Sequence, residues 1–164
     1  MIEFDFGAVL GALHQAGVEF ILVGGLSAAI QGAPVQTFDV DVVHRRTAEN
    51  VAHLMPVLQL LDAYYRLQPE RRLSPAESGL LSSGHQNLMT KFGPLDLLGA
   101  IGNGLGYEEL LPNSTEMLIA EGVRIRVLNL ETLIALKEQL GGEKDLAMLP
   151  LLRRTLAEKR SGIQ

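Results

Sequence analysis

The sequence predicts a mixed α/β (α+β) fold, in which helices flank a mixed β-sheet and further helices follow at the C-terminal end. Short β-branched runs alternate with amphipathic stretches through most of the 164 residues, and the final stretch has helical periodicity. The composition, 47% hydrophobic and 20% charged, is that of an ordinary globular protein. We therefore expect a single domain over residues 1–164, with a core over about 18–128 and a C-terminal helical segment over about 129–160.

The first part of the chain is predicted to end in a strand that carries two carboxylates. Apolar spacing, β-branched runs and breaks at glycine or proline place these elements. In chain order they are a helix over Phe4–Ala16, a strand over Glu19–Val23, a tight turn at Gly24-Gly25, a short helix over Leu26–Gln31 and a strand over Phe38–Val43. Because side chains alternate along a strand, we expect Asp39 and Asp41 to project from the same face.

The next part of the chain is expected to add a helix, a long loop, two hairpins and the C-terminal helices. Thr47 is a favourable N-cap for a helix whose apolar stripe runs from Val51 to Leu61, and Pro56 inside that stripe is expected to kink or split it. The later elements are a loop over Gln68–Gly84 with a short helix at Pro75–Leu80, a hairpin of Gln86–Phe92 and Pro94–Leu98, a short helix over Tyr107–Leu111, a hairpin of Met117–Ala120 and Val123–Leu128, and helices over Leu130–Leu140 and Glu143–Lys159.

Composition and charge exclude several classes of function. The chain has no cysteine, so disulfides, thiolate zinc sites and thiol nucleophiles are excluded. A net charge of −5 argues against a broad nucleic-acid-binding surface, and 5% aromatic residues without tryptophan argue against base stacking. Met1–Gly17 lacks the pattern of a signal peptide, and no run of about 18 apolar residues is present. We expect a cytoplasmic protein with no membrane partner.

Three carboxylates stand out because each lies between apolar residues of a predicted strand: Asp39, Asp41 and Asp96. Aspartate is disfavoured in strands, and two carboxylates at i and i+2 repel each other unless a cation or a proton lies between them. Carboxylate oxygens are the ligands that Mg²⁺ prefers. A D-x-D pair alone is more often a solvated strand face. The order of strand, Gly-Gly, helix and D-x-D, with a third aspartate on a later strand, favours a metal site.

The glycine turn is a candidate phosphate site. Gly24, Gly25 and the start of the following helix would present backbone N–H groups, and Ser27 could add a hydroxyl. Phosphate at one end and metal at the other is the arrangement that a nucleoside triphosphate requires. The alternative is an ordinary turn after a strand, with no role in binding.

At these residues the chain resembles the nucleotidyltransferase superfamily with the polymerase-β-like minimal core. The matching stretches are LVGG at Leu22–Gly25, TFDVDVV at Thr37–Val43 and LDLL at Leu95–Leu98. The stretch NLETLIALKEQLGGEKDLAML looks like the C-terminal segment of the bacterial branch that includes the AbiEii-type toxins. That resemblance implies that Lys137, Lys144 and Asp145 help to bind the nucleotide. The chain departs from many relatives in having Gly-Gly instead of Gly-Ser, and Phe38 where they carry a basic residue.

The resemblance implies a metal-dependent enzyme that transfers a nucleoside monophosphate from a nucleoside triphosphate to a hydroxyl acceptor. Asp39, Asp41 and Asp96 would be the catalytic and metal-binding residues, with Mg²⁺ or Mn²⁺ as cofactor. The acceptor would be a small molecule, a tRNA or a protein. Two alternatives stay open: a non-catalytic nucleotide- or metal-binding scaffold or regulator, and the toxin of a toxin–antitoxin pair. An antitoxin or a second copy of the chain are therefore candidate partners.

Overall fold

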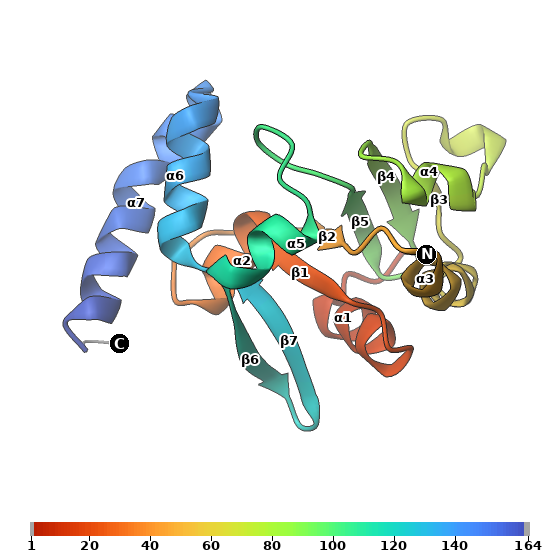
Figure 1. The fold of residues 1–164 in the computed structure, drawn as a ribbon, viewed down its shortest axis with the longest axis horizontal. Helices are drawn as coiled ribbons and strands as arrows, with labels where there is room; N and C mark the ends of the chain where they lie inside the picture. Colours follow the sequence, from red (N-terminus) through yellow and green to blue (C-terminus); the bar gives the residue numbers. More distant parts are fainter. Residues whose placement is uncertain (1, 163–164) are drawn as a thin grey trace.

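Residues 2–162, which the computed structural model describes, form a seven-stranded mixed sheet with helices packed against both faces (Figure 1). Residues 1, 163 and 164 of the predicted domain lie outside the described residues. The strands are β1 (Phe20–Val23), β2 (Val40–His44), β3 (Tyr64–Tyr65), β4 (His85–Thr90), β5 (Gly93–Leu98), β6 (Ser114–Ala120) and β7 (Val123–Leu128). Their order across the sheet is β3-β4-β5-β2-β1-β7-β6.

Helices occupy the connections between strands and the end of the chain. They are α1 (Phe6–Gln15), α2 (Gly24–Ile30), α3 (Ala48–Leu60), α4 (Glu77–Leu81), α5 (Tyr107–Leu110), α6 (Leu130–Leu140) and α7 (Glu143–Arg160), with 3₁₀ turns η1 (Pro69–Arg71) and η2 (Leu111–Asn113). The two predicted hairpins, the short helices and both C-terminal helices are confirmed within one to three residues at most of their ends. The predicted mixed α/β class is therefore confirmed.

The sheet is mixed because two of its strand pairs are parallel. β2 pairs with β5 in parallel, and β1 pairs with β7 in parallel, whereas the remaining neighbours are antiparallel. β2 and β5 are central strands, so both edges of each are hydrogen-bonded. A side chain on either strand is therefore held in a fixed position relative to its neighbours.

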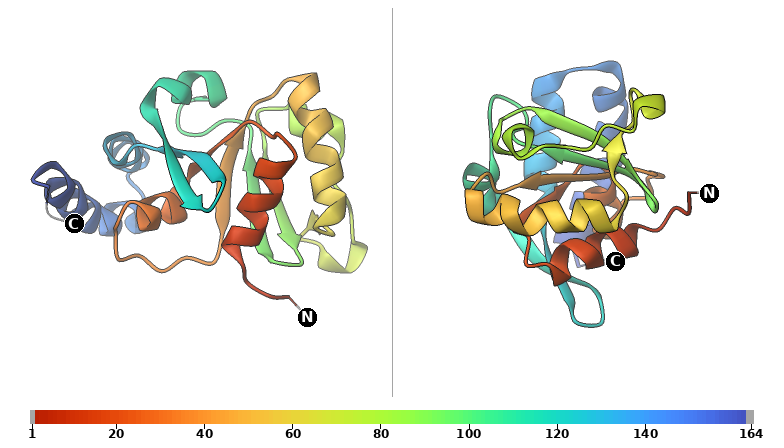
Figure 2. Two further views of the ribbon diagram at one scale, coloured as in Figure 1. Left: turned by 90° about the horizontal axis from the view of Figure 1, so that it is seen from below. Right: turned by 90° about the vertical axis from the view of Figure 1, so that its right-hand side faces the viewer.

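Strand alternation separates two apolar cores. Val40 and Val42 of β2 pack on one side with buried residues of α1 and α3, which lie side by side against that face (Figure 2). Val43, on the other side, packs with Ile21 of β1 and with the helices α6 and α7. Asp41 lies between Val40 and Val42 in the chain, so it faces the second side. The apolar periodicity of β2 thereby determines which face carries the carboxylate.

The boundaries around the two aspartates differ from the prediction. The strand predicted over Phe38–Val43 begins at Val40, so Asp39 lies just before it. β1 ends at Val23, which pairs with Asp41, so β1 offers no strand partner at the level of Asp39. The backbone N–H of Asp39 donates instead to Thr37 Oγ1 at 3.3 Å. The two glycines predicted to form a turn instead form the first residues of α2, which begins at Gly24 and not at Leu26.

Two further features differ from the sequence analysis. Pro56 does not split its helix: α3 is a single helix from Ala48 to Leu60. Its buried stripe, which includes Leu54 and Leu58, continues on both sides of the proline and outweighs the lost backbone donor. The edge strand β3 was not expected, because two tyrosines in a row have no periodicity from which a strand can be inferred.

Candidate metal and nucleotide site

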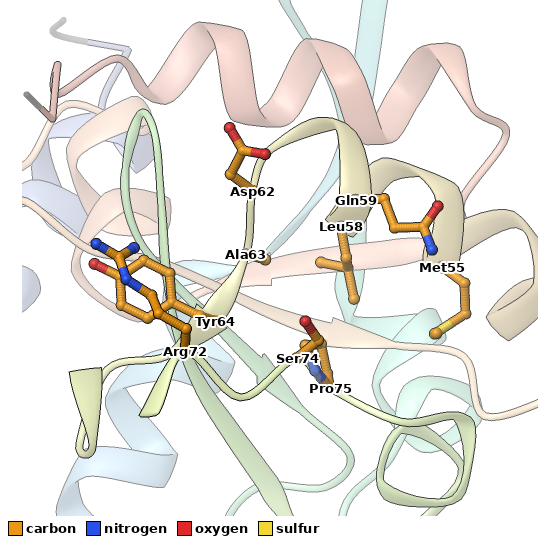
Figure 3. A pocket seen from close by; sticks show the side chains of 9 residues that line it. All are labelled: Met55, Leu58, Gln59, Asp62, Ala63, Tyr64, Arg72, Ser74 and Pro75. Atoms are coloured by element: carbon orange, nitrogen blue, oxygen red, sulfur yellow. The ribbon is translucent and has the colours of Figure 1, made fainter. Parts of the chain in front are cut away.

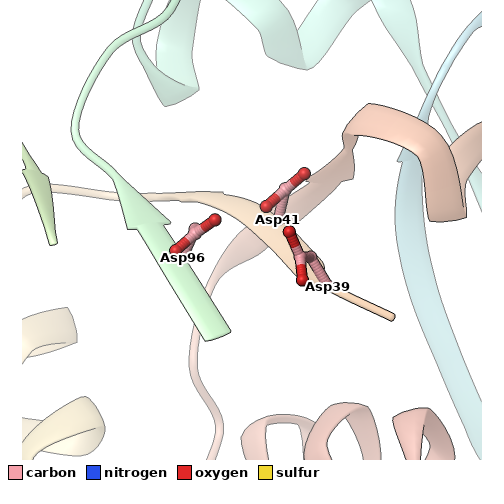
Figure 4. Close-up of side chains that lie close together, drawn as sticks. All are labelled: Asp39, Asp41 and Asp96. Carbon is pink, nitrogen blue, oxygen red and sulfur yellow. The ribbon is translucent and has the colours of Figure 1, made fainter. Parts of the chain in front are cut away.

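The three aspartates predicted to act together converge on one face of the sheet. Asp41 and Asp96 are register partners on the parallel strands β2 and β5, and Asp39 precedes Asp41 by two residues on the same side. The carboxylates point toward one another (Figure 4), and one oxygen of each lies within 4.8 Å of the others. Asp96 is only 8% exposed, whereas Asp39 and Asp41 are partly buried.

The two glycines after β1 leave room for neighbouring side chains, Gly24 for the Asp41 carboxylate and Gly25 for Thr37. A side chain at Gly24 would overlap a carboxylate oxygen of Asp41, and the φ of Gly24 is +71°, a conformation that residues with a Cβ rarely adopt. A Cβ at Gly25 would come within 3.4 Å of the Thr37 side chain. The first turn of α2 therefore lies close to the Asp41 carboxylate. Only glycine fits at position 24, because the backbone there has a positive φ and a Cβ would overlap Asp41.

Burial and neighbouring negative charge raise the pKa of Asp41. Burial, hydrogen bonding to Asp96 and the charges of Asp96 and Asp39 raise the pKa of Asp41 to about 7, from an ordinary value of 3.8. The positive charge of Arg66 opposes this rise. A carboxyl group with a pKa near neutrality binds a proton or a cation readily, since either one relieves the repulsion.

Arg66 is a member of the cluster that the sequence analysis missed. Its guanidinium donates from Nη1 to Asp96 Oδ1 at 2.5 Å and from Nη2 to Asp96 Oδ2 at 3.2 Å. Arg66 follows the unexpected edge strand β3, 30 residues before Asp96. No local pattern marks such a residue, because its contact depends on how β3 pairs across the sheet.

Other residues predicted to bind the nucleotide lie in two different settings. Ser27 is fully buried, and its hydroxyl donates to the carbonyl oxygen of Gly24 at 2.6 Å, so it closes the first turn of α2. Lys137 of α6 donates to Asp145 of α7 at 3.3 Å, which joins the two C-terminal helices. Lys144 is exposed. Neither Lys137, Lys144 nor Asp145 is among the residues of the carboxylate cluster.

A separate hollow lies away from the carboxylates, between α3, β3 and the segment that precedes α4 (Figure 3). Its volume is about 390 Å³. Its lining residues are Met55, Leu58, Gln59, Asp62, Ala63, Tyr64, Arg72, Ser74 and Pro75. None of the three aspartates belongs to that lining, so this hollow and the cluster are different sites.

The donor set is suited to a hard divalent cation. Three carboxylates offer oxygen ligands only, which is the chemistry that Mg²⁺ and Mn²⁺ prefer. The fit is supported by the raised pKa of Asp41, which is caused first by burial and then by the neighbouring carboxylates, whose negative charge a cation would neutralise. Within residues 2–162, none of the helices combines the length and the apolar character needed to span a bilayer.

Fold and site together define a mixed α/β protein with a carboxylate cluster that can hold a divalent cation. No family model matches the sequence, and no curated protein matches it. Among solved structures, its fold is similar to that of a putative nucleotidyltransferase (TM1012) from Thermotoga maritima, with a TM-score of 0.54 and 18% identity over 92% of this chain and 89% of that chain. At that identity the likeness shows a shared fold. The AbiEii-type branch stays a prediction.

Proposed function

We propose that the protein is a metal-dependent nucleotidyltransferase, which transfers a nucleoside monophosphate from a nucleoside triphosphate to a hydroxyl acceptor. The observation that carries this proposal is the convergence of Asp39, Asp41 and Asp96 beside the glycine start of α2. The fold shared with the Thermotoga maritima protein supports the same class of reaction. Two independent lines, side-chain geometry and backbone similarity, thus support one chemistry.

In this proposal the aspartates hold a divalent cation against the triphosphate. Asp39 and Asp41, at the start of β2, would supply carboxylate oxygens, and Asp96 would supply a third from the neighbouring strand β5. Bound there, Mg²⁺ or Mn²⁺ would neutralise charge that develops on the phosphate oxygens. Gly24 and Gly25 would let the triphosphate approach the backbone, since neither carries a side chain.

The transfer itself is a single displacement at phosphorus. The acceptor hydroxyl oxygen forms a bond to the α-phosphorus while the bond from that phosphorus to the bridging oxygen breaks, and pyrophosphate leaves. In this proposal Asp96 would receive the hydroxyl proton. Most of the rate enhancement would come from positioning and charge stabilisation, because phosphoryl transfer requires little covalent participation by the protein.

The C-terminal helices are proposed to contribute to nucleotide binding. Lys137 is held by Asp145 and is partly buried, so its ammonium group is fixed relative to α6 and α7. Lys144 is exposed at the start of α7. The resemblance in this segment motivates the proposal, and measured nucleotide affinity of Lys137→Ala and Lys144→Ala variants tests it.

A transfer assay tests the proposed function. The purified protein is incubated with each α-labelled nucleoside triphosphate, Mg²⁺ or Mn²⁺ and a whole-cell extract, and the labelled product identifies the acceptor. We expect Asp39→Ala and Asp41→Ala to lose transfer by at least about 100-fold while they remain folded. Glu121→Ala, which removes an exposed carboxylate from the turn between β6 and β7, is the matched control and should retain transfer.

Two results would argue against this function. Transfer that persists in both Asp39→Ala and Asp41→Ala would exclude the carboxylates as the reacting centre. Tight triphosphate binding by the wild type without release of pyrophosphate, for every nucleotide and extract tested, would instead indicate a non-catalytic binding protein of the same fold.

A further inference from the structure

Arg66 brings a positive charge into the carboxylate cluster and is held there by hydrogen bonds to strand β4. Its backbone N–H donates to the carbonyl oxygen of Asn87 at 3.1 Å, which extends the pairing of β3 with β4. Its Nη1 also donates to the carbonyl oxygen of Leu88 at 3.0 Å. These two bonds to β4 fix the guanidinium beside Asp96, so their ion pair follows from the strand pairing and not from a chance surface contact.

The ion pair is shielded, and it leaves the cluster short of neutrality. The side chains of Arg66 and Asp96 are 25% and 12% exposed, so solvent screens them only in part. Among the ion pairs within residues 2–162, this is the one that reaches a carboxylate of the cluster. Three ionised carboxylates and one guanidinium carry a net charge of −2, which still attracts a cation.

We propose that Arg66 is an internal counter-ion, which competes with a divalent cation for Asp96 and makes the site prefer the cation together with a triphosphate. The proposal rests on the proposed function for the presence of that cation. Both oxygens of Asp96 accept hydrogen bonds from Arg66, so a cation held by Asp96 would lie close to the guanidinium and be repelled by it. A free cation would therefore bind more weakly than three carboxylates alone would allow.

A triphosphate removes that repulsion. Its anionic oxygens are strong acceptors for a guanidinium, whose planar fork matches phosphate as well as it matches carboxylate. When Arg66 turns to a phosphate oxygen, Asp96 is released to hold the cation or to receive the hydroxyl proton. Arg66 is thus a positioning residue that couples the arrival of the nucleotide to the readiness of Asp96.

Manganese binding measured by electron paramagnetic resonance tests this coupling without any transfer reaction. Wild type, Arg66→Ala and Arg66→Gln are titrated with Mn²⁺ alone and again with a non-hydrolysable triphosphate. Arg71→Ala is the matched control, since it removes the same charge from the neighbouring turn, where Arg71 donates to Gln68. We expect both Arg66 variants to bind free Mn²⁺ about tenfold more tightly than wild type or Arg71→Ala, and to gain less from the triphosphate.

Opposite results separate this proposal from the proposed function. If Arg66 only fastened β3 to β4, the variants would lose thermal stability while their affinity for free Mn²⁺ stayed at the wild-type value, which would overturn the proposal. Equal affinity of wild type for Mn²⁺ with and without triphosphate would overturn it too, even if neither variant folds. An Asp41→Asn variant that binds Mn²⁺ as wild type does would instead overturn the metal site itself.

Discussion

At the scale of single residues, the properties of Asp41 follow from three neighbours. Gly24 leaves space on one side, Asp96 lies directly opposite on β5, and Asp39 adds a further negative charge. Burial disfavours the charged form of Asp41, and both carboxylates repel it. The fold therefore holds Asp41 in a position that is unfavourable for an ionised carboxylate, and a bound cation would make that position favourable.

The pH dependence of stability tests this account of Asp41. Because its pKa rises from 3.8 to about 7 on folding, its ionisation costs nothing below pH 4 and destabilises the folded state increasingly as the pH rises to 7. We expect Asp41→Asn to exceed wild type in free energy of unfolding by about 2 to 4 kcal/mol at pH 8, and to show no gain at pH 4. Urea unfolding without divalent cations at the two pH values measures the difference, and a gain of equal size at both would contradict the raised pKa.

Gly24 offers a second test at the same scale. Alanine at this position should lose about 1 kcal/mol to its positive φ and should also displace the Asp41 carboxylate. Gly122→Ala is the matched control, since Gly122 has a φ of +72° with no atom within 4 Å of its added Cβ. Both variants should lose stability, but only Gly24→Ala should also weaken Mn²⁺ binding. Equal Mn²⁺ affinity in the two variants would show that the contact with Asp41 has no role in the site.

At the scale of elements, the parallel pairing of β2 with β5 brings the carboxylates together. Much of this could be predicted, because alternation along a strand already places Asp39 and Asp41 on one side, and Asp96 lies between leucines in a clear hairpin. The parallel register that sets Asp41 beside Asp96 could not, since it depends on long-range pairing that no local pattern encodes. Arg66 was missed for the same reason, because β3 has only two residues.

The error at Asp39 has a similar cause. The alternation of Asp39 with its apolar neighbours fits a continuing strand, yet the pairing of β2 with β1 stops where β1 is followed by α2. The end of one element is thus determined by a neighbouring element. Gly24 was likewise predicted only in part. The Gly-Gly pair indicated a tight turn, but the close approach of Gly24 to Asp41 depends on the folded structure and cannot be read from the sequence.

The helix α3 provides a test of stability at the element scale. Pro56 lies in its interior and is exposed, so it removes a backbone donor without filling the core. Alanine there should restore the backbone donor and improve helix propensity. Part of that gain is offset, because the unfolded chain has more conformational freedom with alanine than with proline. We expect Pro56→Ala to raise the free energy of unfolding by about 1 to 2 kcal/mol in thermal or urea unfolding. A loss of stability would show that α3 requires the proline.

At the scale of the whole molecule, the site lies on the central strands β2 and β5, and other elements of the sheet lie on either side of it. Toward one edge of the sheet, Arg66 follows β3 and is hydrogen-bonded to β4, and toward the other edge β1 leads into α2 (Figure 1). The face opposite to the carboxylates is closed by α1 and α3 over the larger apolar core. Both faces of the sheet thus contribute an apolar core, and the face with the second core also carries the carboxylates.

The central claim is that Asp39, Asp41 and Asp96 form one metal and nucleotide site. Crystals grown with Mn²⁺ and a non-hydrolysable triphosphate, measured by anomalous diffraction, test it directly. We expect an anomalous peak at about 2.0 to 2.2 Å from carboxylate oxygens of Asp39 and Asp41, with phosphate oxygens completing the coordination. A triphosphate bound elsewhere, or manganese that contacts none of the three aspartates, would contradict the account.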